Sequence, residues 1–435
     1  MKKIVFPVLF TCFVSLSFGQ TTKKAESYLE AKQLDKAKTE IEGVLAKSPN
    51  DAEANYLKSK IYVQIAADPQ SKGLVQGDVR AQALESFKKA IADSANMKAK
   101  LVIIKDGYKP VFDMYTGYFE EGAKAFNEAA GSQNKEEFAV AMNDFINADK
   151  VGQYIAANKW AAIGVIDTTL VLNIGKAAIN SKNDEIAKTY LLKLADAKIK
   201  GTQGENDPTY VFPYQWLVMH YKDAKDEANM VKYADLAKEV YPHDDYVDFV
   251  LIDYYRGKKD MPSVIGRYKS LVQNNPDSLS YHFNYANDIF GYVYNSDEGT
   301  VIQNKPELLN TLRTELDKAL SLAPNDVNNN WLFAQYHYNN GIETRDSANK
   351  IHGTKPEDVK KKADLTALSI EHFKQAIPYG QKAVSILEEE KTKDNKSKYK
   401  SITNLMQNIY QSMGDKANLK VYGDKYDAAD AMFVK

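Results

Sequence analysis

Residues 214–276 read YQWLVMHYKDAKDEANMVKYADLAKEVYPHDDYVDFVLIDYYRGKKDMPSVIGRYKSLVQNNP and carry one pattern twice. Three positions recur with the same residue type at a spacing of 34, in the pairs Leu217 and Leu251, Tyr221 and Tyr255, and Pro242 and Pro276. A second apolar set precedes each proline, formed by Ala234 and Ala237 and then by Tyr268 and Leu271. This spacing predicts two amphipathic helices per period, and the proline ends the second helix because it lacks an amide hydrogen.

The period resembles the tetratricopeptide repeat (TPR), which has 34 residues and two helices. The same register begins near the N-terminus with Ala25, Tyr28, Ala37, Ile41 and Pro49, and it continues through most of residues 22–435. The resemblance implies an all-α, TPR-like α-solenoid of about 8–9 helical hairpins with inserted loops. It also implies a binding scaffold rather than an enzyme.

Breaks in the register divide the chain into four predicted segments. These are a signal peptide at 1–19, N-terminal repeats at 20–205, central regular repeats at 206–350 and a C-terminal helical region at 351–435. Glycine, proline and polar residues predict inserted loops at 67–79, 295–306 and 342–362. Pro378 is expected to kink or break the helix that contains it.

The composition is that of an ordered soluble protein, with 44% hydrophobic and 26% charged residues. Lysine and arginine number 57 against 58 aspartate and glutamate residues. This balance provides no electrostatic basis for nucleic-acid binding, so we expect none.

The N-terminus has the features of a secretory signal peptide. Lys2 and Lys3 precede an apolar run over residues 4–18, and cleavage is expected after Gly19. A membrane anchor is the alternative, although the run is short for a bilayer span. Cys12, the only cysteine, is a candidate lipidation site. We therefore expect export to the periplasm or association with the outer membrane, and no stable membrane span in the mature chain.

The resemblance also predicts where a partner would bind. In this family the first helix of each hairpin lines a concave groove through positions 2, 5, 9 and 12 of the repeat. The corresponding groove residues here are Gln215, Met219, Lys222, Tyr246, Phe249, Asp253, Arg256, Phe283, Asn287, Phe290, Tyr336 and Asn339. Aromatic, amide and charged side chains of this kind suit a protein or peptide partner. The alternative is that the aromatic members pack in the helical core.

Some members of the family hold a C-terminal carboxylate with a lysine–asparagine clamp at positions 5 and 9. Gln215 and Met219, and then Phe249 and Asp253, occupy those positions here. The clamp is absent, so an adaptor for chaperone tails is not expected.

No catalytic, metal or cofactor motif accompanies the repeats. The six histidines do not form the paired zinc motif of hydrolases. His243, Asp244 and Asp245 make a compact polar cluster that could hold a cation, but a solvated loop between repeats is the simpler interpretation. The sequence therefore predicts a non-catalytic protein-interaction scaffold of the bacterial cell envelope. A glycan-binding accessory protein of an outer-membrane nutrient-uptake system is the second hypothesis.

Overall fold

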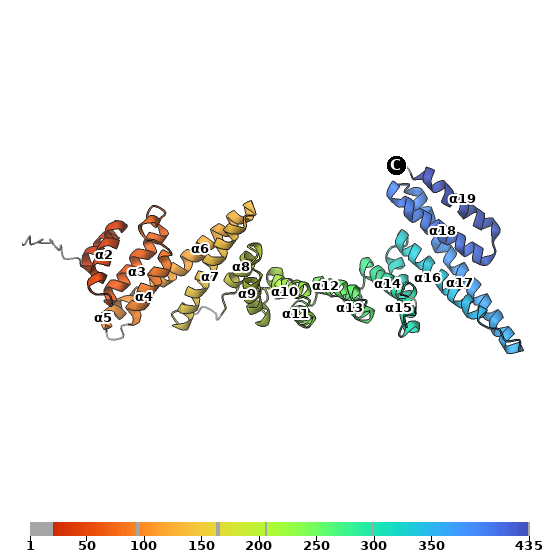
Figure 1. Ribbon diagram of the computed structural model, residues 1–435, viewed down its shortest axis with the longest axis horizontal. Coiled ribbons are helices and arrows are strands. Elements are labelled where there is room, and N and C mark those ends of the chain that lie inside the picture. Colours follow the sequence, from red (N-terminus) through yellow and green to blue (C-terminus); the bar gives the residue numbers. More distant parts are fainter. Residues whose placement is uncertain (1–20, 93–95, 162–165, 205–206, 298, 434–435) are drawn as a thin grey trace, which may run out of the picture. The chain divides into compact units, whose positions relative to one another are not determined.

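The computed structural model describes residues 21–92, 96–161, 166–204, 207–297 and 299–433 (Figure 1). In these ranges the secondary structure consists of nineteen α-helices, three short 3-10 helices and one isolated bridge between Gly201 and Gly204. The predicted all-α class is confirmed. The predicted signal peptide at 1–19, with Cys12, lies outside the described residues.

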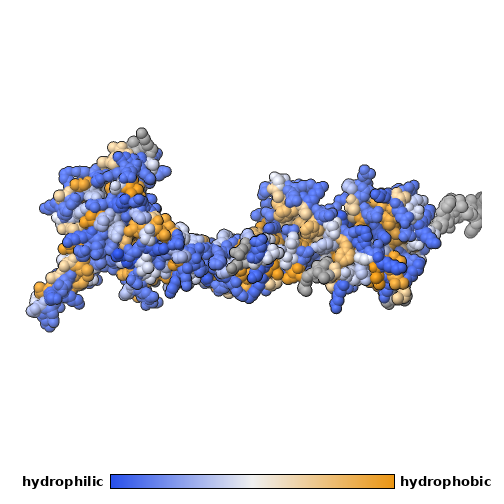
Figure 2. Space-filling view, turned by 180° about the vertical axis from the view of Figure 1, so that it is seen from behind, coloured by the Kyte–Doolittle hydropathy of each residue, from blue (hydrophilic) through white to orange (hydrophobic). Residues whose placement is uncertain are grey.

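The chain divides into two compact units, Met1–Tyr241 and Pro242–Lys435. In both units the surface is mostly hydrophilic, with smaller areas of exposed apolar side chains (Figure 2). The helices of the first unit are α1 (Thr22–Glu30), α2 (Leu34–Lys47), α3 (Ala52–Ala67), α4 (Val79–Ala92), α5 (Met97–Lys105), α6 (Lys109–Ser132), α7 (Lys135–Ala157), α8 (Thr168–Asn180), α9 (Asp184–Asp196), α10 (Val211–Asp223) and α11 (Glu227–Val240).

The second unit contains eight α-helices in its described residues. They are α12 (Tyr246–Gly257), α13 (Met261–Asn274), α14 (Leu279–Tyr294), α15 (Lys305–Leu322), α16 (Val327–Asn349), α17 (Pro356–Glu389), α18 (Lys396–Met413) and α19 (Lys416–Met432). The 3-10 helices are Lys72–Leu74 and Pro208–Tyr210 in the first unit and Lys393–Asn395 in the second.

Consecutive helices pack in pairs, and each pair stacks on the next. The hairpins are α1–α2, α3–α4, α6–α7, α8–α9, α10–α11, α12–α13, α14–α15, α16–α17 and α18–α19. Nine hairpins in the described part of the chain agree with the predicted number. Helix α5 lies outside this pairing and contacts α3 and α4.

The turn inside a regular hairpin repeats the same chemistry. Lys225 and Lys259 each have a φ of 57° and end the first helix in the left-handed region. The amide of the next residue then donates to the carbonyl five positions back, from Asp226 to Tyr221 and from Asp260 to Tyr255. Each aspartate side chain also caps the second helix. The two turns are 34 residues apart, which explains the regular spacing of the hairpins.

A second repeated contact joins the proline that ends one hairpin to the first helix of the next. Asn55 and Asn330 donate from Nδ2 to the carbonyls of Pro49 and Pro324, in each case at 2.9 Å and across six residues. His282 occupies the same position after Pro276, and its Nε2 lies 2.9 Å from that carbonyl. These three side chains are buried. Each satisfies a carbonyl that the end of a helix leaves without an intrahelical partner.

Large side chains fill the core of each unit. In the first unit one apolar cluster extends from Ala25 to Ala187 and includes the fully buried Phe87 and Phe145. In the second unit a cluster centred on Phe373 and Tyr399 joins α16, α17, α18 and α19. Burial of the apolar stripe on each helix is the main favourable term that holds such stacks together.

Two predictions for the C-terminal part were wrong. Most of the segment predicted as a loop at 342–362 is helical, because α16 extends to Asn349 and α17 starts at Pro356. Its polar composition reflects two long helices that bury only a narrow stripe, with Ala348 and Ser369 on the buried side. Pro378 does not end its helix, since α17 continues to Glu389. The loops predicted at 67–79 and 295–306 are largely confirmed, because α3 ends at Ala67, α4 begins at Val79 and α14 ends at Tyr294.

The two units are defined by compactness, whereas the predicted segments 20–205, 206–350 and 351–435 are defined by the regularity of the repeat. The two divisions describe different properties, and the predicted segments remain a prediction.

Candidate functional site

Every predicted groove residue lies on the first helix of a hairpin. Helix α10 of the first unit carries Gln215, Met219 and Lys222. The other nine belong to the second unit, where α12 carries Tyr246, Phe249, Asp253 and Arg256, α14 carries Phe283, Asn287 and Phe290, and α16 carries Tyr336 and Asn339. Their roles in binding remain a prediction.

Helix α12 presents two exposed aromatic side chains. Tyr246 is 43% exposed and Phe249 is 38% exposed. They are three residues apart and therefore share one side of the helix, while Val247, Val250 and Leu251 are buried on the other side. Phe249 also meets the ring of Tyr281 edge-on at 5.4 Å. Exposed aromatic rings anchored in this way are typical of protein-binding surfaces.

Other members of the predicted set have structural contacts. The Arg256 guanidinium is 2.6 Å from the Asp288 carboxylate and donates to the Tyr268 hydroxyl at 3.2 Å. Asp288 raises the pKa of Arg256, so this ion pair joins α12 to α14 at neutral pH. Phe290 is buried and contacts the ring of Tyr294 at 5.0 Å. For Phe290 the structure therefore favours the core-packing alternative.

A pocket of about 310 Å³ lies between α14 and α16 in the second unit. It brings together three predicted residues, Phe283, Asn287 and Phe290, but not Tyr336 or Asn339. The repeat positions did not single out Asn328, Trp331 and Gln335, which also line it. The buried Nε1 of Trp331 has no hydrogen-bond partner in the described structure. An indole N–H in this state favours a ligand that brings an acceptor.

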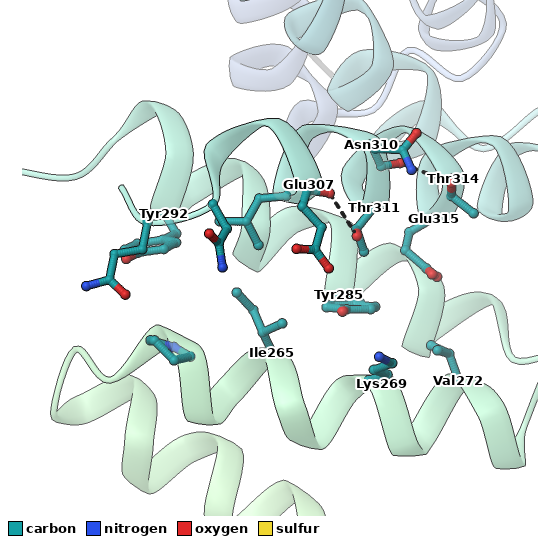
Figure 3. Close-up of a pocket in the computed structure, with 14 residues that line it drawn as sticks. Ile265, Lys269, Val272, Tyr285, Tyr292, Glu307, Asn310, Thr311, Thr314 and Glu315 are labelled. Atoms are coloured by element: carbon teal, nitrogen blue, oxygen red, sulfur yellow. Dashed lines mark hydrogen bonds between the residues drawn. The ribbon is translucent and has the colours of Figure 1, made fainter. Parts of the chain in front are cut away.

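A second pocket, of about 440 Å³, is formed mainly by second helices (Figure 3). Lys269 reaches it from α13 and Glu307 from α15, on opposite walls. Asn310, Thr311 and Thr314 add amide and hydroxyl groups, and the Thr311 hydroxyl donates to the Glu307 carbonyl at 3.0 Å. Because the family rule concerns first helices only, the sequence did not point to this surface.

Tyr285 forms part of the wall of this second pocket and is only 3% exposed. Its ring stacks on Tyr268, with ring centres 5.4 Å apart. Burial, with Glu315 and Glu307 nearby, raises the pKa of Tyr285 to about 12, so its hydroxyl stays protonated and can donate. The pocket therefore offers donors, acceptors and both signs of charge to a small polar ligand.

The structure gives the polar cluster at 243–245 a structural role. The Asp245 carboxylate accepts a hydrogen bond from Asn275 Nδ2 at 3.0 Å and another from the Tyr281 hydroxyl at 3.1 Å. These bonds connect the loop before α12 to the next turn of the stack. No group of three or more metal-binding side chains occurs among the described residues.

Two further histidines lie close together in the second unit. The ring centres of His337 and His372 are 6.4 Å apart, and each ring has a buried Nδ1 without a hydrogen-bond partner in the described structure. Burial, assisted by Arg313 and His372, lowers the pKa of His337 to about 4. His337 is therefore neutral at physiological pH.

The first unit has a charged pocket of about 350 Å³ beside α4, α6 and α7. Arg80 and Lys72 both pair with Glu121, and the Tyr118 hydroxyl donates to Asp78 at 2.7 Å. Asp144 faces this network, and burial together with Glu121 raises its pKa to about 6.

Replacement of Asp144 by asparagine is expected to stabilise the protein. The carboxyl is harder to ionise in the folded state, where its pKa is about 6, than in the unfolded state, where it is about 3.9. The resulting penalty is absent below the unfolded pKa and grows as the pH rises through the folded pKa. Asp144→Asn should therefore raise the free energy of unfolding at pH 7 by about 1–2 kcal/mol.

Urea unfolding measured at neutral pH and near pH 4 tests this prediction. The difference between Asp144→Asn and the native protein should shrink on acidification. Glu120→Gln, at an exposed carboxylate on α6, is the matched control and should change little. Equal unfolding free energies for Asp144→Asn and the native protein at pH 7 would contradict the proposed penalty.

A membrane-crossing helix would have to be both long and apolar, and no helix in the described ranges meets both conditions.

The fold is similar to solved TPR structures, although no protein-family model and no curated protein matches the chain. The TPR domain of P58(IPK) is 12% identical, with a TM-score of 0.26 over 94% of this chain and 89% of that chain. The human IFIT1 dimer with m7Gppp-AAAA is 14% identical, with a TM-score of 0.24 over 87% and 90%. The APC/C hetero-tetramer Cut9–Hcn1 is 8% identical, with a TM-score of 0.22 over 93% and 88%.

At TM-scores this low the similarities carry no inference about ligand or partner. The assignment of the fold therefore rests on the paired helices, the 34-residue turn spacing and the recurring proline contact. On these grounds the chain is an all-α, TPR-like α-solenoid.

Proposed function

We propose that this protein is a non-catalytic protein-interaction scaffold. The observation that carries the proposal is the pair of exposed aromatic side chains on α12, Tyr246 and Phe249, beside buried neighbours on the same helix. The pocket between α14 and α16 adds a concave site within the same unit, with the unpartnered Trp331 indole in its wall. A protein or peptide that places apolar side chains on α12 would bury area that water now covers.

The proposed setting is the bacterial cell envelope, in the periplasm or at the outer membrane. It is supported by the charged, apolar and small residues of the predicted signal peptide at 1–19. The near balance of acidic and basic residues supports a partner that is not a nucleic acid. Neither statement depends on the solved structures.

Loss of both aromatic rings is expected to weaken partner binding at least about tenfold, because exposed aromatic anchors contribute most of the energy of an interface. The test variant is Tyr246→Ala combined with Phe249→Ala. Candidate partners are captured from envelope extract, identified, purified and then titrated against both proteins. Helix content and melting temperature should be unchanged, because both side chains are largely exposed.

The matched control is Tyr426→Ala combined with Val421→Ala, which removes two exposed apolar side chains from α19 of the same unit. The control should bind each partner as the native protein does. If the α12 variant also retained full affinity for every identified partner, the proposed surface on α12 would be wrong.

A glycan-binding accessory role is the second candidate function. It is favoured by the pocket between α13, α14 and α15, where amides, hydroxyls, Lys269 and Glu307 surround a small volume. Sugar hydroxyls both donate and accept, so such a mixed lining suits them. Binding on a glycan array that is lost in Glu307→Gln but retained in the α12 variant would establish this role. An array without any bound glycan would exclude it for the glycans tested.

A further inference from the structure

Helix α5 of the first unit has an unusual surface. It has nine residues, reads MKAKLVIIK and lies outside the paired hairpins. Ala99 and Ile103 are buried on its inner side. Four large apolar side chains on the same helix are exposed, namely Met97 at 62%, Leu101 at 52%, Val102 at 46% and Ile104 at 55%. So much exposed apolar surface on a short helix indicates a binding surface.

The lysines of α5 flank this apolar surface. Met97, Leu101 and Ile104 are spaced by four and three residues and form one stripe, opposite the buried Ala99 and Ile103. At 100° per residue, Lys98 and Lys105 lie along one border of the stripe and Lys100 along the other. An apolar stripe between rows of lysine is the arrangement of helices that lie in a membrane interface.

A lysine-lined groove adjoins the stripe. This groove of about 310 Å³ is shared by α1, α3 and α5, and Val102 belongs both to its wall and to the exposed face. Lys23, Lys60 and Lys98 line it together with Glu26 and Glu53. Glu53 pairs with Lys98 at 2.8 Å. Asp106, just after the helix, accepts from the Tyr56 hydroxyl and pairs with Lys60 at 3.2 Å. These contacts partly neutralise the nearby acidic groups.

We propose that α5 docks on an anionic phospholipid surface. The apolar stripe would enter the boundary between headgroups and acyl chains, and the bordering lysines, with the adjoining groove, would contact headgroup phosphates. A second copy of this chain fits less well, because a symmetric contact through α5 would bring two sets of lysines together. This surface lies on the first unit and does not depend on the partner surface proposed for α12.

Vesicle binding by the full chain tests the proposal. Vesicles of equimolar phosphatidylglycerol and phosphatidylcholine are compared with vesicles of phosphatidylcholine alone. Replacement of two stripe residues in Leu101→Glu with Ile104→Glu is expected to lower the partition coefficient on the anionic vesicles at least about tenfold. Lys100→Gln with Lys105→Gln should lower it about tenfold at low salt and less at high salt.

Hydrogen exchange locates the contact within the chain. Amides of residues 97–105 should exchange more slowly when anionic vesicles are added, which separates α5 from any binding by the apolar run at 4–18. Val301→Glu, at an 82% exposed apolar residue of the second unit, is the matched control and should bind as the native chain does.

Two outcomes would overturn the proposal. One is equal partitioning of the Leu101→Glu with Ile104→Glu variant and the native chain, with no slowing of exchange over 97–105. The other is a native dimer, detected by light scattering, that dissociates in this variant while anionic vesicles bind neither protein. The second outcome would assign the stripe to a contact between copies.

Discussion

Replacement of His282 by leucine should lower the free energy of unfolding of the second unit by about 3–5 kcal/mol. His282 is 6% exposed, its Nδ1 lies 2.5 Å from Glu315 Oε2, and its Nε2 lies 2.9 Å from the Pro276 carbonyl. Both ring nitrogens thus face acceptors, and the ring links α14 to α15 and to the preceding hairpin. Leucine would leave the buried Glu315 carboxylate and the Pro276 carbonyl without this partner.

Urea unfolding followed by hydrogen exchange over α14 and α15 would measure the loss. His337→Leu is the matched control, because His337 is also buried in this unit but its Nδ1 has no partner in the described structure. That substitution should be nearly neutral. Adding Glu315→Leu to His282→Leu should recover most of the stability, since no buried charge then remains unpaired. Equal losses for His282→Leu and His337→Leu would show that shape, not pairing, determines the effect.

Replacement of Phe373 by alanine is expected to have an effect of similar size, a loss of about 3–5 kcal/mol. The Phe373 ring is 1% exposed and fills the seam between α16 and α17, where it contacts Tyr338 with ring centres 5.8 Å apart. Its removal would leave a cavity that two long, well-packed helices cannot close. Denaturant unfolding of the full chain, resolved by exchange of α16 and α17 amides, would measure the loss.

Gly341 makes the Phe373 contact possible and provides the control. A Cβ added at Gly341 would lie 2.5 Å from Phe373 Cε1, which is closer than atoms can approach. Gly341→Ala alone should therefore cost about 1–3 kcal/mol. In the Phe373→Ala background the same change should cost much less, because the space is then free. Additive effects of the two substitutions would contradict direct contact as the cause.

The sequence anticipated part of the candidate site. The repeat register correctly placed all twelve predicted residues on first helices, because a 34-residue period fixes which helix a position belongs to. It could not separate exposed side chains from packed ones, since Phe249 and Phe290 are both phenylalanines at groove positions. Only the neighbouring hairpins decide that Phe249 is exposed and Phe290 is buried. The pocket of Lys269, Tyr285 and Glu307 draws on α13, α14 and α15 and has no signature in any single segment.

The stretch 214–276 by itself determined the class of fold. Recurring apolar residues define two helices per period, and the prolines mark where each hairpin ends, because these effects act between residues close in sequence. Tertiary structure alone decided how the ends are joined. Asn55, His282 and Asn330 bond the proline six residues earlier, but they differ in residue type, so no repeat is visible in the letters. Likewise, the polar segment around 342–362 becomes helical because α16 and α17 pack along each other, and such a contact between distant residues depends on the folded chain.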